Sequence, residues 1–368
     1  MPATSTMPAP LRAAIDAELA GLTPSRTEAG ARRLSNRYLA DHPADAPIVA
    51  TDEDVAAYLT TRMPATFAAV SFALDQVRDA APGLAPRSVL DLGSGTGAAT
   101  WAAWDTFGDL ERADLVDYST TMLSAARRMF AASDLTVTTS LGDAGAASRR
   151  ATTARDAEAV ATGTPTHDLA VAAFVLSELT TAQRTAVVER LTSAASQCVL
   201  VVEPGTPAGY RRILTVRAEL IEAGWRIVAP CPHEHVCPLA QGAGSAAGSA
   251  AGAVAGSDTT DWCHAAVRLE RTAAHRRAKG GERSFEDEKL AYVAAVPPRP
   301  NDDSDRDPDL PLDLPAARVL RHPQTRPGHI RLELCTSDGA HESTTVAKRD
   351  KDAFRAARKV EWGQAWRP

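Results

Sequence analysis

The sequence predicts an α/β fold in which strands alternate with helices and form a parallel sheet covered by helices on both faces. Two observations support this prediction. Short apolar runs of strand length alternate with helical segments between residues 87 and 223. The glycine-rich turn Gly93-Ser94-Gly95-Thr96-Gly97 directly follows the first of these strands and opens a helix. In sheets of this kind, ligands bind beyond the carboxyl ends of the strands, where the strand order reverses.

The N-terminal region, residues 1–85, is predicted to be helical. Leu and Ala recur at helical spacing in residues 8–40 and 52–81, and few residues there are β-branched. Pro82-Gly83 and Pro86 then end the helical pattern.

The second predicted region, residues 86–300, holds the alternating elements. Strands are expected at 88–92, 113–116, 135–139, 169–175 and 198–202, and helices at 98–107, 120–131, 181–195 and 208–223. Two more strands, 225–229 and 289–296, flank a cysteine-rich insertion at 230–285. Within this insertion, residues 242–257 are almost purely Ala, Gly and Ser, which predicts a flexible segment without a fold of its own.

A Pro- and Asp-rich linker at 297–315 leads to a small basic C-terminal β module, residues 316–368. This module alternates in the manner of short strands from Arg318 to Val346, and a basic helix follows around 348–359. It carries 11 Lys and Arg against 6 Asp and Glu, whereas the whole chain has a net charge of −6. A basic tail on an acidic body indicates a surface for a polyanion, although an ordinary solvated helix face would have the same charge pattern.

Composition narrows the class of protein. The chain has 368 residues, of which 44% are hydrophobic, enough to bury a core in one or two domains. Its five cysteines are too few and odd in number for a disulfide framework, which indicates a reducing compartment. We find no secretory signal pattern and no apolar stretch of the ~18 residues that a membrane span needs. A cytoplasmic protein without a membrane partner is therefore expected.

The glycine turn is the strongest candidate site. Glycine lets a tight turn form and lets the backbone approach a ligand, and the helix N-terminus that follows suits an anionic group. Three carboxylates end or follow the first three strands. Asp91 is expected to order the loop or hold a ligand amine, Asp117 to accept hydrogen bonds from a ribose diol, and Asp143 to meet an adenine edge.

The order of the motif indicates which nucleotide binds. Dinucleotide sites have G-x-G-x-x-G, whereas this chain has G-x-G-x-G preceded by Asp-Leu. That order resembles motif I of class I methyltransferases, which predicts S-adenosylmethionine as the cofactor. The alternatives are an NAD-type site and a glycine turn without a ligand. The predicted cofactor-binding residues are Asp91, Gly93, Ser94, Gly95, Gly97, Asp117 and Asp143.

Two glutamates follow later strands. Glu178 stands after the fourth strand and Glu203 at the end of the fifth, where either side chain could point into the cleft. Alternatively, Glu178 caps the next helix and Glu203 orders the turn. No motif typical of a catalytic base follows the fourth strand, so the sequence assigns no catalytic residue.

Four of the five cysteines lie in polar loops or at strand ends: Cys231, Cys237, Cys263 and Cys335. Thiolates from distant segments suit a metal or cluster that fixes an irregular region. The near pair is wider than the usual C-x₂₋₄-C of zinc sites, although nearby histidines leave a Cys/His zinc site open, and inert thiols are the other alternative. Cys198 lies within an apolar strand and is predicted to be a core residue.

The sequence as a whole resembles a known family. It is similar to the mitochondrial small-ribosomal-subunit methyltransferase-like family, whose members associate with ribosome assembly, and looks like a bacterial member of it. The resemblance spans residues from about 50 to 365. The segments that carry it are Tyr58–Thr66, Asp91–Gly97, Val175–Leu179, Glu203–Pro207, the Cys-Pro-His stretch at 231–238, Trp262–His264, Phe285–Lys289 and Leu334–Thr336.

The resemblance implies a class I methyltransferase fold, S-adenosylmethionine binding and a [4Fe-4S] cluster, with zinc as the alternative metal. By position, the cluster ligands would be Cys231, Cys237, Cys263 and Cys335. The predicted function is methyl transfer to small-subunit ribosomal RNA or during small-subunit assembly. The alternative is a catalytically inactive assembly factor that keeps the fold, the cofactor and the cluster. A small-molecule methyltransferase is disfavoured by the basic C-terminal module.

Overall fold

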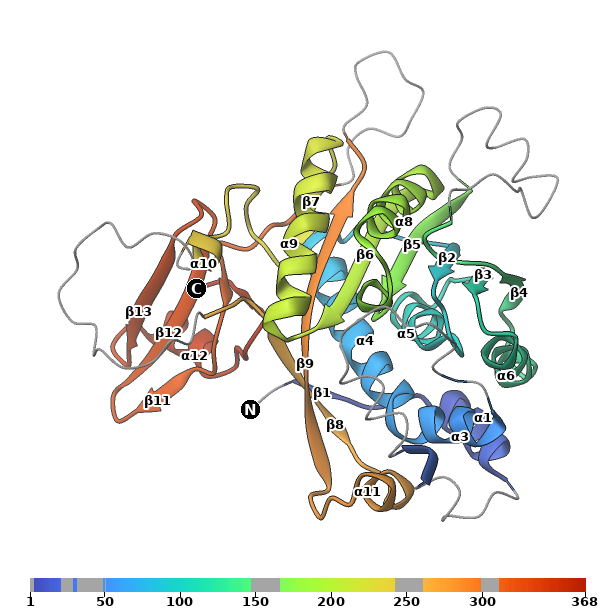
Figure 1. Cartoon of the computed structure of the whole chain (residues 1–368). Helices are drawn as coiled ribbons and strands as arrows, with labels where there is room; N and C mark the ends of the chain where they lie inside the picture. Colours follow the sequence, from blue (N-terminus) through green and yellow to red (C-terminus); the bar gives the residue numbers. More distant parts are fainter. Residues whose placement is uncertain are drawn as a thin grey trace.

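The computed structural model describes residues 3–20, 29–31, 49, 51–146, 166–241, 261–298 and 311–368. These residues form two sheets, one of nine strands and one of five (Figure 1). Within the described ranges, every helix is too short or too polar to cross a bilayer.

The nine-stranded sheet has the strand order of the class I methyltransferase (Rossmann-like) fold, which confirms the predicted fold class. Its parallel part runs in the order β4, β3, β2, β5, β6, and β9 then pairs with β6 in the antiparallel direction. The order reverses between β2 and β5, next to the glycine turn. The strands of this part are β2 (Ser88–Leu92), β3 (Arg112–Asp117), β4 (Thr136–Leu141), β5 (His167–Ala173), β6 (Ala195–Pro204) and β9 (Phe285–Val296).

Three further strands extend the sheet through β9. β7 (Arg226–Ala229) and β8 (Ala265–Glu270) both pair antiparallel with β9, and β1 (Ala3–Ser5) pairs parallel with β8. The long β8–β9 hairpin extends below the rest of the sheet in Figure 1 and carries the short helix α11 (Ala273–Lys279).

Helices cover both faces of the sheet. α4 (Met63–Ala80), α5 (Ala98–Phe107) and α6 (Thr120–Phe130) share a hydrophobic core with one face, and α1 (Ala9–Leu19) and α3 (Asp52–Thr61) join them. α8 (Thr181–Ala194) and α9 (Pro207–Glu222) form the core of the opposite face. Alternate residues of one strand divide between the two cores: Val89 packs on the first side, and Leu90 and Leu92 pack on the second.

Local sequence signals set where these helices begin. The Thr180 hydroxyl caps α8 and forms a capping box with Gln183. Thr206 caps α9, and Pro207 occupies its first turn. Pro64 likewise lies in the first turn of α4, where its missing N–H costs nothing, and separates α4 from α3 at Arg62.

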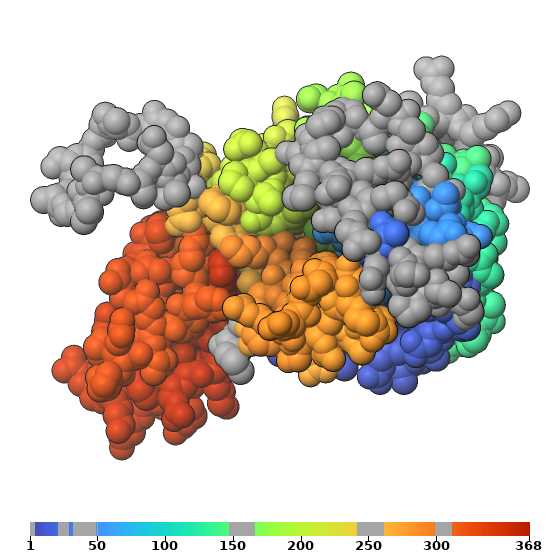
Figure 2. All heavy atoms as spheres, turned by 60° about the horizontal axis from the view of Figure 1, so that its bottom comes forward, coloured from blue at the N-terminus to red at the C-terminus, as the bar shows by residue number. Residues whose placement is uncertain are grey.

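The five-stranded sheet forms a separate lobe beside the large domain (Figure 2). Its core contains Val319, Ile330, Leu332 and Trp366. It consists of β10 (Ala317–Val319), β11 (Gln324–Arg326), β12 (His329–Thr336), β13 (His341–Ala347) and β14 (Ala365–Trp366), with α12 (Lys351–Ala357) packed against it.

Several expectations need correction. The large sheet is mixed rather than parallel, because β9 returns antiparallel between β6 and β7. The strand expected at 169–175 ends at Ala173, and a 3₁₀ turn, η1 (Leu176–Glu178), follows. The insertion at 230–285 contributes the ordered elements α10 (Pro238–Gln241), β8 and α11. Of the helix expected at 8–40, α1 spans 9–19, and most of the remainder lies outside the described residues, as do 242–257 and 299–310.

Candidate functional site

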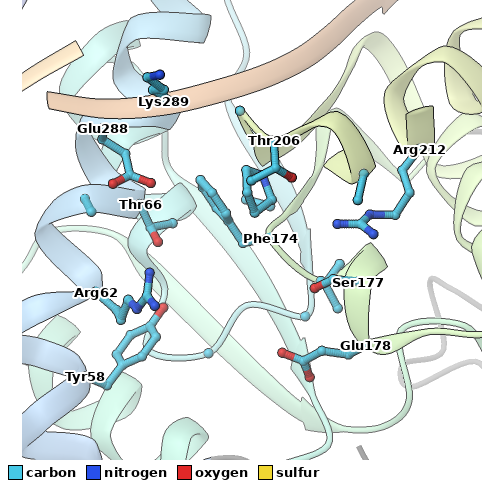
Figure 3. A pocket seen from close by; sticks show the side chains of 18 of the residues that line it. Tyr58, Arg62, Thr66, Phe174, Ser177, Glu178, Thr206, Arg212, Glu288 and Lys289 are labelled. Atoms are coloured by element: carbon cyan, nitrogen blue, oxygen red, sulfur yellow. The ribbon is translucent and has the colours of Figure 1, made fainter. Parts of the chain in front are cut away.

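A cavity of about 650 Å³ opens at the carboxyl ends of the central strands. The loops after β2, β3, β5 and β6 form one wall, and α3, α4 and β9 form the other (Figure 3). This is the position where the strand order reverses, which is where ligands bind in open α/β sheets.

The glycine turn forms the floor of this cavity. Gly93, Gly95 and Gly97 all have positive φ angles, of 71°, 54° and 84°, which only glycine adopts without strain. Gly93 and Gly95 line the cavity. Gly97 is not among the lining residues. It faces the core instead, since a Cβ there would lie 2.6 Å from the Phe130 ring. A Cβ at Gly93 would likewise lie 2.5 Å from the Val175 side chain, so close packing requires glycine at 93 and 97, whereas Gly95 is the most open of the three toward the cavity.

Ser94 lies behind the cavity wall. Its side chain is buried, it is not among the residues that line the cavity, and its amide donates to the Val116 carbonyl (3.1 Å). Among the described residues, its hydroxyl has no hydrogen-bond partner.

The three predicted carboxylates have different surroundings. Asp117 lines the cavity, and its carboxylate accepts hydrogen bonds from the amides of Gly95 (2.8 Å) and Ser119 (2.8 Å). Asp91 is 1% exposed and accepts from the Thr100 hydroxyl (2.8 Å) and amide (3.2 Å). It therefore orders α5, and burial raises its pKa to about 7.

Asp143 lies outside the cavity wall. Its carboxylate accepts hydrogen bonds from the Gly145 amide (2.8 Å) and from the Gln183 side chain (2.9 Å). These contacts stabilise the loop after β4. Asp143 is thus not among the residues that line the cavity, and its contact with an adenine edge stays a prediction.

Phe174 has the most unusual backbone in the cavity wall. It immediately follows β5 and is the one non-glycine residue with a positive φ (58°) among the described residues. Strained conformations of this kind persist where the surrounding structure imposes them and cluster at functional sites. Figure 3 shows the Phe174 ring near the middle of the cavity, between Thr66 and Thr206.

Two glutamates face the cavity from opposite sides (Figure 3). Glu178 accepts a hydrogen bond from the Tyr118 hydroxyl (3.2 Å), and burial raises its pKa to about 7. Glu288 comes from β9, and burial raises its pKa as well. Glu203 was the other glutamate expected to point into the cleft. It instead lies fully buried behind the wall and accepts from the Leu176 amide (3.1 Å) and Arg212 Nε (2.5 Å), so it orders the turn after β5.

The four predicted metal ligands converge although they are far apart in the sequence. Cys231 and Cys237 lie in the loop after β7, Cys263 precedes β8, and Cys335 lies in β12. All four thiols line one small cavity between the large domain and the C-terminal lobe. In the part of the chain that the structure describes, no group of three or more His, Cys, Asp or Glu side chains is placed so that it could hold a metal ion. Cys198 lies elsewhere, fully buried in β6.

The surroundings of these thiols are largely buried and include apolar side chains and the arginines Arg217 and Arg318. Burial is the main cause of the raised pKa of Cys231, Cys263 and Cys335, which reaches about 12 for Cys335. Cys335 Sγ lies 3.2 Å from His233 Nε2, and Cys237 Sγ lies 3.1 Å from the Tyr210 hydroxyl. Thiolates are costly here unless a bound cation compensates for their charge.

Comparison with known proteins identifies the family. A family model described as "Mitochondrial small ribosomal subunit Rsm22" matches residues 52–367. The chain belongs to the Rsm22 family. It is also 27% identical over 319 residues to the human "Ribosome assembly protein METTL17, mitochondrial". That match covers 83% of this chain and 61% of the human protein, so the chain spans about three fifths of the length of this relative.

Solved structures similar to this Rsm22-family chain include two described as methyltransferases. One is a putative RNA methyltransferase from Pyrococcus horikoshii, 10% identical, with 72% of this chain and 98% of that chain covered and a TM-score of 0.37. The other is magnesium protoporphyrin IX methyltransferase from Synechocystis, 12% identical, with 72% and 92% covered and a TM-score of 0.36.

The sequence did not single out Phe174 or Glu288 as candidate site residues. Phe174 stood inside a predicted strand, and its outward turn depends on a backbone angle that no residue pattern reveals. Glu288 enters the cavity only because β9 inserts beside β6. A signal was present in the run Phe285-Glu286-Asp287-Glu288-Lys289, whose density of charge is unusual for a central strand.

Proposed function

We propose that this chain binds S-adenosylmethionine in the cavity and transfers its methyl group to small-subunit ribosomal RNA, in the cytoplasm. The proposal is supported by the glycine turn, by Asp117 at the next strand end and by membership of the Rsm22 family. When bound, S-adenosylmethionine supplies a methyl group on a positively charged sulfur.

The cofactor would lie over the glycine turn. Its carboxylate suits the N-terminal end of α5, where backbone N–H groups and the helix dipole favour negative charge. Gly95 leaves room for the ligand, since a Cβ there would point at the Met122 methyl (3.1 Å) and the Tyr58 hydroxyl (3.4 Å). Asp117 would accept from the ribose through the lone pairs that its two backbone donors leave free.

The remaining half of the cavity suits a nucleobase. The single observation that carries this reading is the strained Phe174, whose ring lies in the middle of the cavity where a base could stack on it. Methyl transfer is an in-line displacement, so the protein mainly has to align the acceptor with the methyl group and exclude water. Glu178 and Glu288 would accept hydrogen bonds from base N–H groups, and Arg211 and Lys289 at the cavity would attract the phosphates.

The test is transfer of label from methyl-labelled S-adenosylmethionine to naked small-subunit RNA and to immature subunits. Wild type should label one of them. Phe174→Ala should lose labelling with unchanged cofactor affinity, and Phe174→Tyr should retain it. If neither RNA is labelled while the cofactor binds, the methyl-transfer proposal is wrong.

A second candidate is a ribosome assembly factor that does not transfer methyl groups. The human relative carries the name of a ribosome assembly protein, and the sequence after β5 has no motif typical of a catalytic base. This candidate predicts that the protein restores subunit assembly in a deletion strain even as the Phe174→Ala variant, whereas the methyltransferase predicts failure.

We propose further that the four clustered thiols hold a [4Fe-4S] cluster, with zinc as the alternative. Four thiols in an apolar cavity are the donor set that both metals accept. A tetrahedral zinc at 2.3 Å from each sulfur would bring the sulfurs to about 3.8 Å from one another, whereas a cluster holds its thiolates farther apart. The five residues that separate Cys231 from Cys237 exceed the usual C-x₂₋₄-C spacing of zinc sites, which supports the cluster.

Metal analysis of anaerobically purified protein tests this centre. We expect about four irons per chain and broad absorption near 400 nm, as iron–sulfur proteins commonly show. Each Cys→Ser change at 231, 237, 263 or 335 should lose the metal, whereas Cys198→Ser should retain it, since that thiol is buried in β6. Stoichiometric zinc without iron would show that the thiols hold zinc rather than a cluster. Metal-free protein would refute both metal sites.

A further inference from the structure

Two arginines are buried beside the thiol cavity. Arg217, on α9, is 6% exposed, and Arg318, on β10, is 2% exposed. Together with Cys231, Cys237 and Cys263 they line a second small cavity that adjoins the first. They come from the large domain and from the C-terminal lobe, so the thiols lie between one arginine of each.

Both guanidinium groups hold the backbone of the cysteine-bearing loop. Arg217 Nη2 donates to the carbonyls of His233 (2.8 Å) and His235 (2.9 Å). Arg318 Nε donates to the Pro230 carbonyl (2.6 Å), and its Nη1 donates to the Gln76 side chain and to the Gly363 carbonyl (3.3 Å). All of these acceptors are neutral.

Neither positive charge is balanced. Within the described ranges, the ion pairs include no carboxylate partner for Arg217 or Arg318. Among the described residues, moreover, Arg217 Nε is buried without a hydrogen-bond partner. A buried charge without a counter-charge strongly destabilises a fold, and arginine does not escape by losing its proton. Negative charge on the thiols would balance the two arginines, because Arg217 and Arg318 line the same cavity as three of the cysteines and favour the ionised form of Cys231 and Cys335.

We propose that Arg217 and Arg318 are the fixed counter-charges of a dianionic metal–thiolate centre on the four cysteines. The inference rests on the proposed metal centre. Four thiolates carry a charge of −4, and either a [4Fe-4S]²⁺ core or Zn²⁺ adds +2, which leaves −2. Two guanidinium groups neutralise this charge. Because Arg318 belongs to the C-terminal lobe and Arg217 to α9, the same charge balance joins the lobe to the large domain.

The test compares Arg217→Met and Arg318→Met with the charge-preserving Arg217→Lys and Arg318→Lys. Arg112→Met is the matched control, because Arg112 also donates to a carbonyl, that of Thr166 (2.7 Å), but lies in β3, away from the cysteine-bearing segments. Three quantities are measured on metal-loaded protein and on protein stripped of metal: the rate of metal loss to a chelator, the thermal midpoint and, for iron, the one-electron reduction potential.

We expect each Met variant to lose metal at least tenfold faster than wild type, while the Lys variants and Arg112→Met stay within threefold. For iron, removal of one positive charge should disfavour the reduced, more negative centre by about tenfold, a shift of about 59 mV for a one-electron couple. Metal-free Arg217→Met should be at least as heat-stable as metal-free wild type, because the unbalanced buried cation is gone.

Arg217→Met that lowers the thermal midpoint of loaded and stripped protein by the same amount would overturn the proposal, since the arginine would then serve only the loop backbone. Wild-type rates of metal loss in both Met variants would overturn it too. Wild-type protein without metal would instead refute the metal centre itself, so the two failures are distinguishable.

Discussion

Gly97→Ala should destabilise the fold without entering the ligand cavity. Its φ of 84° is left-handed, which costs a residue with a Cβ about 1–2 kcal/mol. The new Cβ would also lie 2.6 Å from the Phe130 ring and 3.1 Å from Leu115, and over-packing of this kind costs about 1–3 kcal/mol. The free energy of unfolding should therefore fall by about 2–5 kcal/mol.

Gly108 offers the matched control. It ends the same helix with φ 70°, and a Cβ there would meet nothing within 4 Å. Gly108→Ala should therefore lose only the backbone contribution, about 1–2 kcal/mol. Urea titrations of both variants measure the difference, which isolates the contact with Phe130. Equal losses in the two variants would show that Gly97 is required for its backbone angle alone, and would refute the packing argument.

Two further predictions concern charge. Burial raises the pKa of Glu178 to about 7, so its neutral form stabilises the folded protein at low pH and this contribution is lost as the pH rises through 7. The unfolding free energy of wild type relative to Glu178→Gln should therefore fall between pH 5 and pH 8 in ligand-free protein, and a flat difference would contradict the assignment. Arg358→Glu with Lys359→Glu, in the exposed basic turn that follows α12, should weaken RNA binding and reduce the slope of log affinity against log salt by about 1.4–1.8. Arg12→Glu on α1, where that side chain is exposed, should leave the slope unchanged, and an unchanged slope in the Arg358 and Lys359 variant would rule that turn out as a contact surface.

Much of the fold could be predicted because local signals agree with the tertiary structure. The predicted bounds of β2 and α5 match the structure, since an apolar strand, three glycines and an Ala-rich helix all specify the same turn. The caps on α8 and α9 set helix starts within one residue of prediction. These contacts act within a few residues, where spacing alone is informative.

What depends on distant pairing could not be predicted. β8 (Ala265–Glu270) lies within the cysteine-rich insertion, outside the run of alternating strands and helices, and it is a strand in the structure because it pairs with β9. The same limit applies at the site, where the sequence could not show that the Asp143 carboxylate accepts a hydrogen bond from Gln183 of α8. The roles of Arg217 and Arg318 likewise appear only when α9 and β10 meet at the thiols.

The proposed function requires that the cavity binds S-adenosylmethionine over Gly95. Isothermal calorimetry of wild type and of Gly95→Asp tests it most directly, with Gly108→Ala as the control for left-handed strain outside the cavity. We expect one binding site per chain in wild type and in Gly108→Ala, and no measurable binding in Gly95→Asp. The aspartate side chain would enter the cavity next to Tyr58 and place a second carboxylate beside Asp117. Equal affinity in wild type and Gly95→Asp, or no binding in folded wild type, would contradict it.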